Sequence, residues 1–550
     1  MWLPTPFIGY FSHHDGLMVT TVSQLQNVIR NGGAWPFNQY GSFWAFVYAL
    51  PLWNIKQEYL LIFMRLMTLV FYFTTAWLTY KIARLFGGRT FANAAVMLLL
   101  GNQVFLFDLL PWPSAVAMPL ITLVSYLLLR IMVDEVRTQS RIITEVIVIG
   151  FILPMVILTR IQVGVVLFAI SLLLIYFFGK KREVVIFILS FSCTIGMFFA
   201  YLASKGWLVQ SLQDQLYFGS SYLRSEDNPV PIFTSLGVLT VIAILGLSKK
   251  LNYNVGGIRS RPKAIVQIGF SSFVLLVGAL LILIRRSMNP YSMYLLTIHR
   301  LWISIILGAI IYFSFTQAKK TYRAWQDHNL LDKELQMMNF LALLSIASQM
   351  QIFPLFDQMH SWWGSTPGVV VFLLIFKDRY EKSKNSIGQE KKLTQSMLLA
   401  TLVLTIIPFG LQTSNLGNLA TNANLRGVLL PQTSANEIST LQMFFERNIS
   451  DGTRVLNLCP DPDILLKPKF VNTDSRVFIF WPEFFKIDYL KKTFQSSQPE
   501  AAVSCFSENT DTVSLRDYKK LIDNGSTRAI LVDSIGNLSG HDWQIWKFEN

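Results

Sequence analysis

The chain has 550 residues, enough for roughly three or four soluble domains, but its composition excludes a soluble protein. Hydrophobic residues make up 52% of the sequence and charged residues only 15%, whereas a soluble chain carries roughly 25% charged residues. The apolar residues are gathered in long runs, and many of these runs have a length close to the roughly 20 residues that a helix needs to cross a bilayer. The sequence therefore predicts a polytopic α-helical membrane protein.

The net charge of +14 is unevenly distributed along the chain. Residues 1–413 hold 33 Lys and Arg against 17 Asp and Glu, a difference of +16, and residues 414–550 hold 14 against 16, a difference of −2. The basic excess lies in short clusters between apolar runs. Because no tail or helix carries a continuous basic stripe, nucleic-acid binding is excluded.

Twelve apolar runs are candidate membrane spans. They cover about residues 59–80, 91–110, 113–133, 142–159, 161–178, 184–204, 230–248, 265–284, 294–316, 335–353, 363–376 and 395–413. The eleventh is short enough to be partly re-entrant. We expect a bundle of about 12 helices over residues 59–413, with an N-terminal loop at residues 1–58 and a soluble domain at residues 425–550.

Basic residues between the runs alternate regularly. The six gaps after odd-numbered runs, together with Arg130 at the end of the third run, hold 24 of the 33 Lys and Arg residues of the membrane part. Because these residues collect in short cytoplasmic loops, the six gaps are predicted to be cytoplasmic. The other gaps, residues 1–58 and the C-terminal segment are then extracytoplasmic. We expect a multi-pass protein of the plasma (inner) membrane.

Residues 1–58 are predicted to be translocated although no apolar run precedes them. Met1–Ser12 is too short and has the wrong pattern for a signal peptide. Either the N-terminus crosses the membrane unaided, or a first helix is encoded upstream of Met1, which is the alternative that we favour.

The C-terminal segment has the pattern of a small α/β domain. Ser434-x-x-Glu437 matches a capping box and begins an apolar helical pattern. Short β-branched runs follow at Arg454–Leu458, Arg476–Phe480, Ala502–Cys505, Ala529–Val532 and Gln544–Phe548, with a helical stretch at residues 514–522. Strands alternating with helices predict an α/β fold. No glycine-rich phosphate loop or nucleophile elbow is present, so we expect a structural or substrate-recognition role.

The three cysteines give no zinc framework. Cys193 lies in an apolar run and is expected to be a small buried hydrophobe. Cys459 and Cys505 could form a disulfide if their segment faces an oxidising compartment, although their spacing alone does not establish one.

An amphipathic helix is predicted in the first outer loop, ending at Gly32-Gly33. Its apolar face comprises Met18, Val22, Leu25 and Ile29, and its opposite face Thr20, Gln24 and Asn27. Such a helix suits the membrane surface. Asp15 stands at its start, after His13 and His14. One interpretation makes Asp15 an N-cap. The other makes it a general base for a sugar hydroxyl, with His14 beside it.

A second outer constellation joins the tenth run to the eleventh. It runs from Gln349 to Gly364 and contains Gln349, Gln351, Asp357, His360, Trp362 and Trp363. Aromatic planes stack on sugar rings, so these residues, together with Trp35 in the first loop, are candidates for binding a sugar or acceptor. The alternative interpretation of the tryptophans is an interfacial belt.

Other polar residues on the predicted outer side are interpreted as helix ends and an ordinary polar loop. These are Asp108, Trp112 between two prolines, and residues 210–222. Arg65, Arg160 and Arg300 fall within or at the edge of spans, where ionisable residues are functional candidates unless they snorkel to the interface. Arg285 and Arg286 lie on the outer side, against the charge rule, which indicates a local task or attraction to anionic lipid.

This arrangement resembles the GT-C superfamily, integral-membrane glycosyltransferases that use polyprenyl-phosphate-linked sugars. The features that carry the resemblance are an acidic residue beside a surface helix in the first outer loop, about a dozen spans, an outer Asp/His loop and a C-terminal α/β domain. Asp15 is the only acidic residue in the first loop before Glu58. The resemblance implies that Asp15 is the catalytic base.

The sequence thus predicts transfer of a sugar from a polyprenyl-phosphate-linked donor to a glycan, lipid or protein acceptor on the outer face of the membrane. Arg285 and Arg286 would bind the donor phosphate, for which the arginine fork is suited. No metal or other cofactor is expected, because fixed cations can stabilise a departing phosphate. The alternatives are a lipid-linked glycan polymerase or ligase, which would use arginines and a histidine without Asp15, and a transporter, which would show paired repeats.

Overall fold

A computed structural model describes most of the membrane part and selected pieces of the C-terminal segment. The described residues are 5–8, 15–33, 35–36, 40–103, 109–133, 138–178, 181–222, 290–326, 333–352, 358–381, 416–419, 425–457, 471–472, 499–506, 528–538 and 541–549. The predicted spans at residues 230–248, 265–284 and 395–413 lie outside these ranges. So do several predicted functional residues, namely His14, Arg285, Arg286, Asp357 and Cys459.

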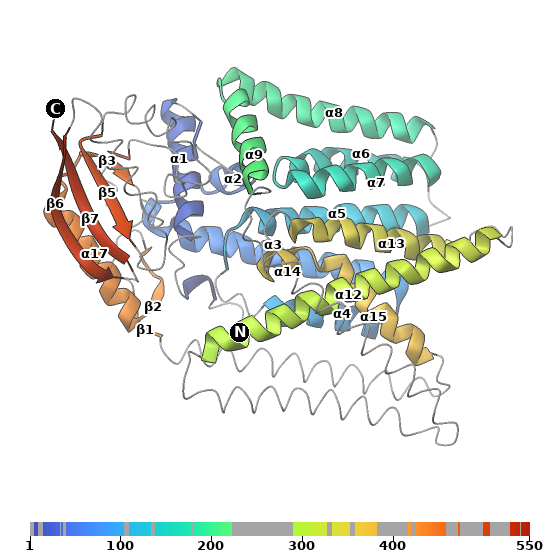
Figure 1. Cartoon of the computed structure of the whole chain (residues 1–550). Coiled ribbons are helices and arrows are strands. Elements are labelled where there is room, and N and C mark those ends of the chain that lie inside the picture. The colour runs from blue at the N-terminus through green and yellow to red at the C-terminus, as the bar shows by residue number, and fades with distance from the viewer. Residues whose placement is uncertain are drawn as a thin grey trace.

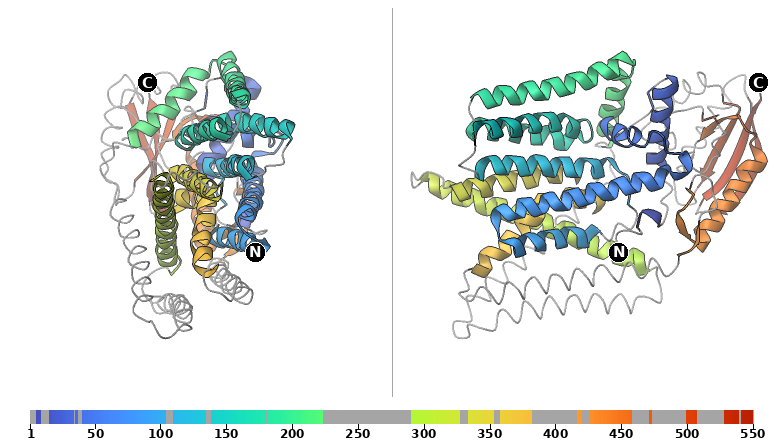
Figure 2. Two further views of the ribbon diagram at one scale, coloured as in Figure 1. Left: turned by 90° about the vertical axis from the view of Figure 1, so that its right-hand side faces the viewer. Right: turned by 180° about the vertical axis from the view of Figure 1, so that it is seen from behind.

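Nine of the predicted spans correspond to described helices, which run side by side as a bundle (Figures 1 and 2). They are α3 (Gln57–Phe86), α4 (Arg89–Gln103), α5 (Pro113–Val133), α6 (Gln139–Ile157), α7 (Ile161–Phe178), α8 (Lys181–Ser204), α12 (Pro290–Gln326), α13 (Lys333–Gln349) and α15 (Thr366–Glu381). Within the described ranges, α3, α5, α6 and α8 are long and apolar enough to cross a membrane, and α4, α7 and α15 contain shorter apolar stretches. The fold is mostly helical and of membrane type, and the total of 12 spans stays a prediction.

Helix α3 turns a polar stripe toward the protein interior and apolar side chains outward. The buried stripe repeats every three or four residues and comprises Arg65, Thr68, Tyr72, Thr75 and Thr79. The threonine hydroxyls donate to carbonyl oxygens four residues earlier in the same helix, so they are satisfied without water. Large apolar side chains such as Trp77 are exposed on the other side, where lipid would cover them.

Among the described elements, helix α8 packs mainly against α6 and also contacts α7 and α9, and much of its remaining surface is exposed. Leu189 and Met197 are exposed there, and so is the free thiol of Cys193. The prediction that Cys193 is buried is therefore wrong. An apolar run in a membrane protein can face lipid as well as protein, and hydropathy does not distinguish the two surroundings.

Hydrogen bonds show which of the described loop segments share an end of the bundle. At one end, Lys333 Nζ donates to Val133 O at 3.0 Å, so the gaps after the third and ninth predicted spans share that end. At the other end, Phe43 N donates to Leu158 O at 3.1 Å, and Trp207 Nε1 donates to Gly33 O at 2.9 Å. The first loop therefore meets the gaps after the fourth and sixth spans.

Short helices cover this second end. They are η1 (Thr5–Phe7), α1 (Leu17–Asn31), α2 (Phe43–Ala49), α9 (Leu208–Tyr222), η3 (Met350–Ile352) and α14 (Gln358–Trp363). The α1 helix lies across the bundle end, with the C-terminal sheet beyond it (Figures 1 and 2). The helix packs against α2 and α3, and Met18, Val22 and Leu25 of its apolar face are buried inside the protein. Thr20 on the opposite face is buried too, so α1 is more enclosed than a helix lying on a membrane surface. The loop predicted at residues 210–222 is wrong, since that stretch is α9.

The described C-terminal residues form a hairpin, a helix and a mixed sheet. The hairpin pairs β1 (Leu416–Leu419) with β2 (Leu429–Pro431). The five-stranded sheet has the order β4 (Val471–Asn472), β3 (Arg454–Asn457), β5 (Ala501–Phe506), β7 (His541–Glu549) and β6 (Arg528–Leu538). Parallel pairs join β4, β3 and β5, and antiparallel pairs join β5, β7 and β6.

Helix α17 (Gln432–Asn448) packs Phe445 edge-on against Trp543 of the sheet. It begins two residues before Ser434, so the predicted capping box does not start it. The C-terminal segment is tied to the start of α3, where Arg426 pairs with Glu58 at 3.6 Å. It therefore lies at the same end of the bundle as the first loop.

Candidate active site

The first candidate residue, Asp15, forms a buried ion pair with Arg65 of α3. Arg65 Nη2 lies 2.6 Å from Asp15 Oδ2, and both side chains are 0% exposed. Arg65 Nη1 also donates to the carbonyl oxygens of Pro6 at 3.3 Å and Ile8 at 3.1 Å. The N-cap of α1 is Gly16, and no side chain caps that helix, so the N-cap interpretation of Asp15 is wrong.

Burying this pair has a high energetic cost. Removing two charges from water costs several kcal/mol per ion, which only close and well-directed contacts offset. Ionisable residues in a membrane-embedded helix are functional candidates by default. Arg65 was one of three such arginines in the sequence, but its partner lies 50 residues earlier, and no local pattern joins the two.

The next turn of α3 continues this polar face. Tyr48 of α2 lies 2.7 Å from Thr68 Oγ1. Since the Thr68 hydroxyl donates to Met64 O, the phenol is the donor. Burial raises the pKa of Tyr48 well above its usual range, against the lowering effect of the hydrogen bond to Thr68. Tyr48 therefore stays neutral and acts as a fixed hydrogen-bond donor.

Two turns beyond Arg65, Tyr72 joins α3 to the predicted tryptophan pair. Trp363 Nε1 donates to the Tyr72 hydroxyl at 3.2 Å, and Trp362 packs edge-on against the Tyr72 ring at 5.2 Å. Seven residues of helix correspond to about 10 Å along the axis. One face of α3 thus connects the Asp15–Arg65 pair with the second predicted constellation.

The tryptophan pair belongs to an aromatic cluster inside the protein. Trp363 stacks on Trp112 with an interplanar angle of 9°, and Trp112 meets Tyr40 edge-on at 5.0 Å. His360 lies edge-on to Trp363 at 5.2 Å. Trp362 and Trp363 are each 1% exposed, which contradicts the interfacial-belt interpretation, because belt residues face lipid headgroups.

A second buried arginine completes the cluster. Arg160, after the end of α6, donates from Nε to Ser114 Oγ at 2.8 Å, and its guanidinium lies over the Tyr40 ring at 5.1 Å. A guanidinium over an aromatic face gains electrostatic stabilisation. The sequence indicated that Arg160 was a candidate but gave neither of these contacts.

Trp35 belongs to a neighbouring group of aromatic rings. It packs against Phe46 at 6.2 Å and Trp207 at 5.7 Å. Among the described ring contacts, none joins Trp35 directly to Trp362 or Trp363. The structure therefore places the predicted sugar-binding tryptophans in two groups.

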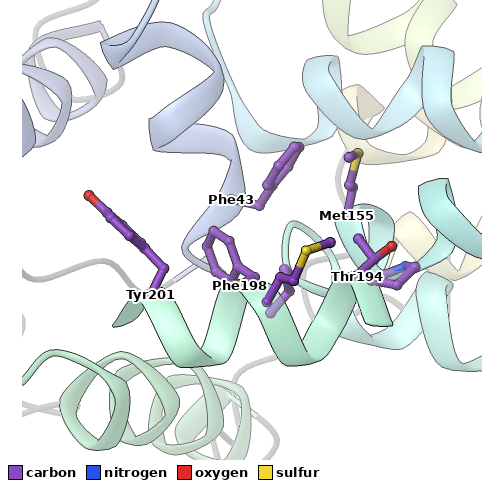
Figure 3. Close-up of a pocket in the computed structure, with 8 residues that line it drawn as sticks. Phe43, Met155, Thr194, Phe198 and Tyr201 are labelled. Atoms are coloured by element: carbon purple, nitrogen blue, oxygen red, sulfur yellow. The ribbon is translucent and has the colours of Figure 1, made fainter. Parts of the chain in front are cut away.

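An apolar hollow of about 280 Å³ opens between α2, α6 and α8 (Figure 3). It is lined by Phe43, Pro154, Met155, Leu158, Thr194, Met197, Phe198 and Tyr201. Figure 3 shows the Phe43 and Phe198 rings on its wall. Because no charged side chain lines it, the hollow suits a hydrocarbon chain better than a sugar.

Among the described residues, no three His, Cys, Asp or Glu side chains converge as a metal site requires. Tyr72 was not predicted as a site residue, and Trp112 was interpreted as part of a helix end. The unusual Pro111-Trp112-Pro113 tripeptide was a signal that could have drawn attention to Trp112. Tyr72, in contrast, sits in an apolar run and carries no distinguishing pattern.

The chain is similar in structure to two membrane proteins. For the apo oligosaccharyltransferase of Archaeoglobus fulgidus, the TM-score is 0.47 at 11% identity, covering 90% of this chain and 66% of that chain. For ArnT of Cupriavidus metallidurans bound to undecaprenyl phosphate, the TM-score is 0.43 at 13% identity, covering 99% of this chain and 96% of that chain. A further structure of the A. fulgidus enzyme, AglB, holds an inhibitory peptide and a dolichol-phosphate, with a TM-score of 0.42 at 10% identity, covering 89% of this chain and 65% of that chain.

The chain spans about two thirds of the length of the A. fulgidus enzyme. No protein-family model and no curated protein matches the sequence. The three reported TM-scores are all below 0.5, so the likeness assigns no activity to this chain.

Proposed function

We propose that the protein is a membrane glycosyltransferase of the GT-C type. It would move a sugar from a polyprenyl-phosphate-linked donor to a glycan, lipid or protein acceptor at the bundle end that carries α1 and the sheet. The observation that carries this proposal is the buried Asp15–Arg65 pair, joined along one face of α3 to the Trp362–Trp363 cluster. A carboxylate held by a cation, about 10 Å along the helix from aromatic rings, can combine proton abstraction with sugar binding.

In the proposed reaction, Asp15 takes the proton of the acceptor hydroxyl. The acceptor oxygen then bonds to the anomeric carbon, and the bond from that carbon to the phosphate oxygen breaks. The lipid phosphate leaves with the electron pair, and attack from the opposite side would invert the configuration. Arg65 holds the carboxylate in one orientation. Because Asp15 is fully buried, the acceptor reaches it only when the segment that covers it is displaced.

The remaining predicted residues have supporting roles in this proposal. Arg285 and Arg286 would stabilise the departing phosphate, so no metal is required. Asp357, His360 and the tryptophans would bind the sugar or acceptor, with His14 beside the base. The apolar hollow would hold part of the isoprenoid chain, because its walls are hydrocarbon and it opens near the exposed face of α8.

The finer architecture is part of the same proposal. The chain would have about 12 spans, and the end that carries the sheet would face away from the cytoplasm, with residues 425–550 forming an extracytoplasmic α/β domain. Two observations support this arrangement. The basic loops alternate with the apolar runs, and the contacts of Arg426 hold the C-terminal segment at the end opposite the basic loops.

A lipid-linked glycan polymerase or ligase is the second candidate. The buried His360 against Trp363, together with buried Arg160, supplies the histidine and arginine that such a mechanism would use. The two candidates differ in whether the reaction depends on Asp15.

Lipid analysis of a deletion strain tests the proposal. Cells that lack the gene should accumulate a polyprenyl-phosphate-linked sugar, and the wild-type gene should reverse this. A gene that encodes the Asp15→Asn variant, expressed at the same level, should not reverse the accumulation. Reversal by Asp15→Asn would favour the polymerase or ligase, and absence of any accumulated lipid-linked sugar would contradict a transferase.

A further inference from the structure

Several buried polar atoms without hydrogen-bond partners lie where α13 and η3 meet α14. They are Ser348 Oγ, Gln349 Oε1 and Nε2, Gln351 Oε1 and Trp362 Nε1. None of these four residues, here named the amide cluster, is more than 6% exposed. Buried polar atoms are nearly always paired, and leaving one unpaired is destabilising. Five such atoms on three elements that contact one another indicate a ligand or bound water.

Two contacts hold the amide cluster in a fixed arrangement. Gln351 Nε2 donates to Trp363 O at 2.9 Å, which ties η3 to α14. At Gly364, an added Cβ would lie 2.7 Å from Ser348 O and 3.0 Å from Gln349 Cα, so the two backbones touch there. Trp362 in turn packs against Tyr72. The elements that carry the amide cluster are therefore held together in the absence of a ligand, as the elements of a recognition site must be.

We propose that the amide cluster binds the hydroxyl groups of the transferred sugar and selects an uncharged one. This inference rests on the proposed function. Gln349 Nε2 and Trp362 Nε1 are donors, and the Gln349 and Gln351 oxygens are acceptors, which matches hydroxyls that both donate and accept. None of the four residues ionises, so an amine or carboxylate on the sugar would be buried without an opposite charge among them.

The test compares Gln349→Leu with Gln317→Leu. Gln317 of α12 is also buried with an unpartnered Oε1, but it lies near the basic end of the bundle, so it is a matched control. Purified proteins in nanodiscs are measured for thermal stability without ligand. Their affinities are then measured for undecaprenyl phosphate and for its glucose, galactose, mannose and glucosamine derivatives.

The parent should bind at least one neutral sugar form about tenfold more tightly than undecaprenyl phosphate, the gain expected from one or two hydrogen bonds. Gln349→Leu should abolish that preference, keep the affinity for undecaprenyl phosphate, and be at least as stable as the parent without ligand. Gln317→Leu should keep the preference.

Three results would overturn the inference. Gln349→Leu could keep the preference, which would mean that the amide cluster holds only water. It could be less stable than the parent, which would make Gln349 structural. The parent could also prefer the glucosamine form. If any one of these three results occurs while Asp15 is still needed to prevent the lipid-linked sugar from accumulating in cells, only this inference fails. If the parent binds no sugar derivative more tightly than undecaprenyl phosphate, and the Asp15→Asn gene reverses the accumulation in deletion cells, the proposed function fails too.

Discussion

Replacing Arg65 by Met should strongly destabilise the protein, because it leaves the Asp15 charge buried alone. Breaking one side of a buried ion pair costs about 3–5 kcal/mol. Both side chains are 0% exposed and 2.6 Å apart, so this pair belongs in that class. The carbonyl oxygens of Pro6 and Ile8 also lose a donor, at about 1 kcal/mol each.

A double-mutant cycle isolates the pair. Arg65→Met, Asp15→Asn and the double variant are unfolded by SDS in mixed micelles, and the free energies of unfolding are compared. The double variant should be more stable than the sum of the single effects predicts, by about 2 kcal/mol or more. The exposed pair Arg426–Glu58, 63% and 25% exposed, is the control and should couple by less than about 1 kcal/mol. If the changes in unfolding free energy caused by Arg65→Met and Asp15→Asn sum to that of the double variant within about 0.5 kcal/mol, the buried ion pair is refuted.

Three further predictions concern topology, phosphate binding and pH. In intact cells, a cysteine introduced at Gly388 should react only with membrane-permeant thiol reagents. A cysteine introduced at Ser497 should react with impermeant reagents as well. Labelling of the cysteine at Gly388 by an impermeant reagent would contradict the predicted topology. Arg285→Lys and Arg286→Lys should slow donor turnover, because Lys keeps the charge but loses the bidentate geometry, and parent rates in both would remove the phosphate role. The hydrogen bond from Arg447, followed by that from Asn448, lowers the pKa of Asp533 below 3.8. The stabilisation from Asp533 should therefore be present above pH 3.8 and be lost as the pH falls through the folded-state pKa of Asp533. Protection of the β6 amides from hydrogen exchange should fall over the same pH range, and Asp533→Asn should abolish this pH dependence.

Local sequence patterns predicted the helices well. The predicted runs at residues 113–133 and 161–178 coincide with α5 and α7, because continuous apolar sequence bounded by charge or proline marks where a span begins and ends. The α9 helix was missed because its polar composition resembles a loop. Its Ser211 and Gln215 are nevertheless buried against neighbouring elements, which the sequence does not reveal.

The site was predictable in residue type but not in arrangement. Asp15, His360, Trp362 and Trp363 were identified because they are unusual residues on the outer side. Their partners come from distant segments, as when Trp363 bonds to Tyr72 on a helix 291 residues earlier. Pairing across such distances is set by how helices pack, and no spacing within one segment specifies it. Gln349 and Gln351 were recognised as part of the second outer constellation, but the same limit left their burial and their contacts with α14 unpredicted.

The central claim, that Asp15 is the base for sugar transfer, is tested most directly by single-turnover transfer. The lipid-linked sugar that accumulates in deletion cells is purified, radiolabelled and given to the protein in nanodiscs with membranes that supply the acceptor. Asp15→Asn should transfer about 100-fold more slowly or worse, the range expected for loss of a general base, while Glu58→Gln transfers at the parent rate. Circular dichroism and size-exclusion profiles must show that both variants are folded. A folded Asp15→Asn protein that transfers the sugar at the parent rate would contradict the account.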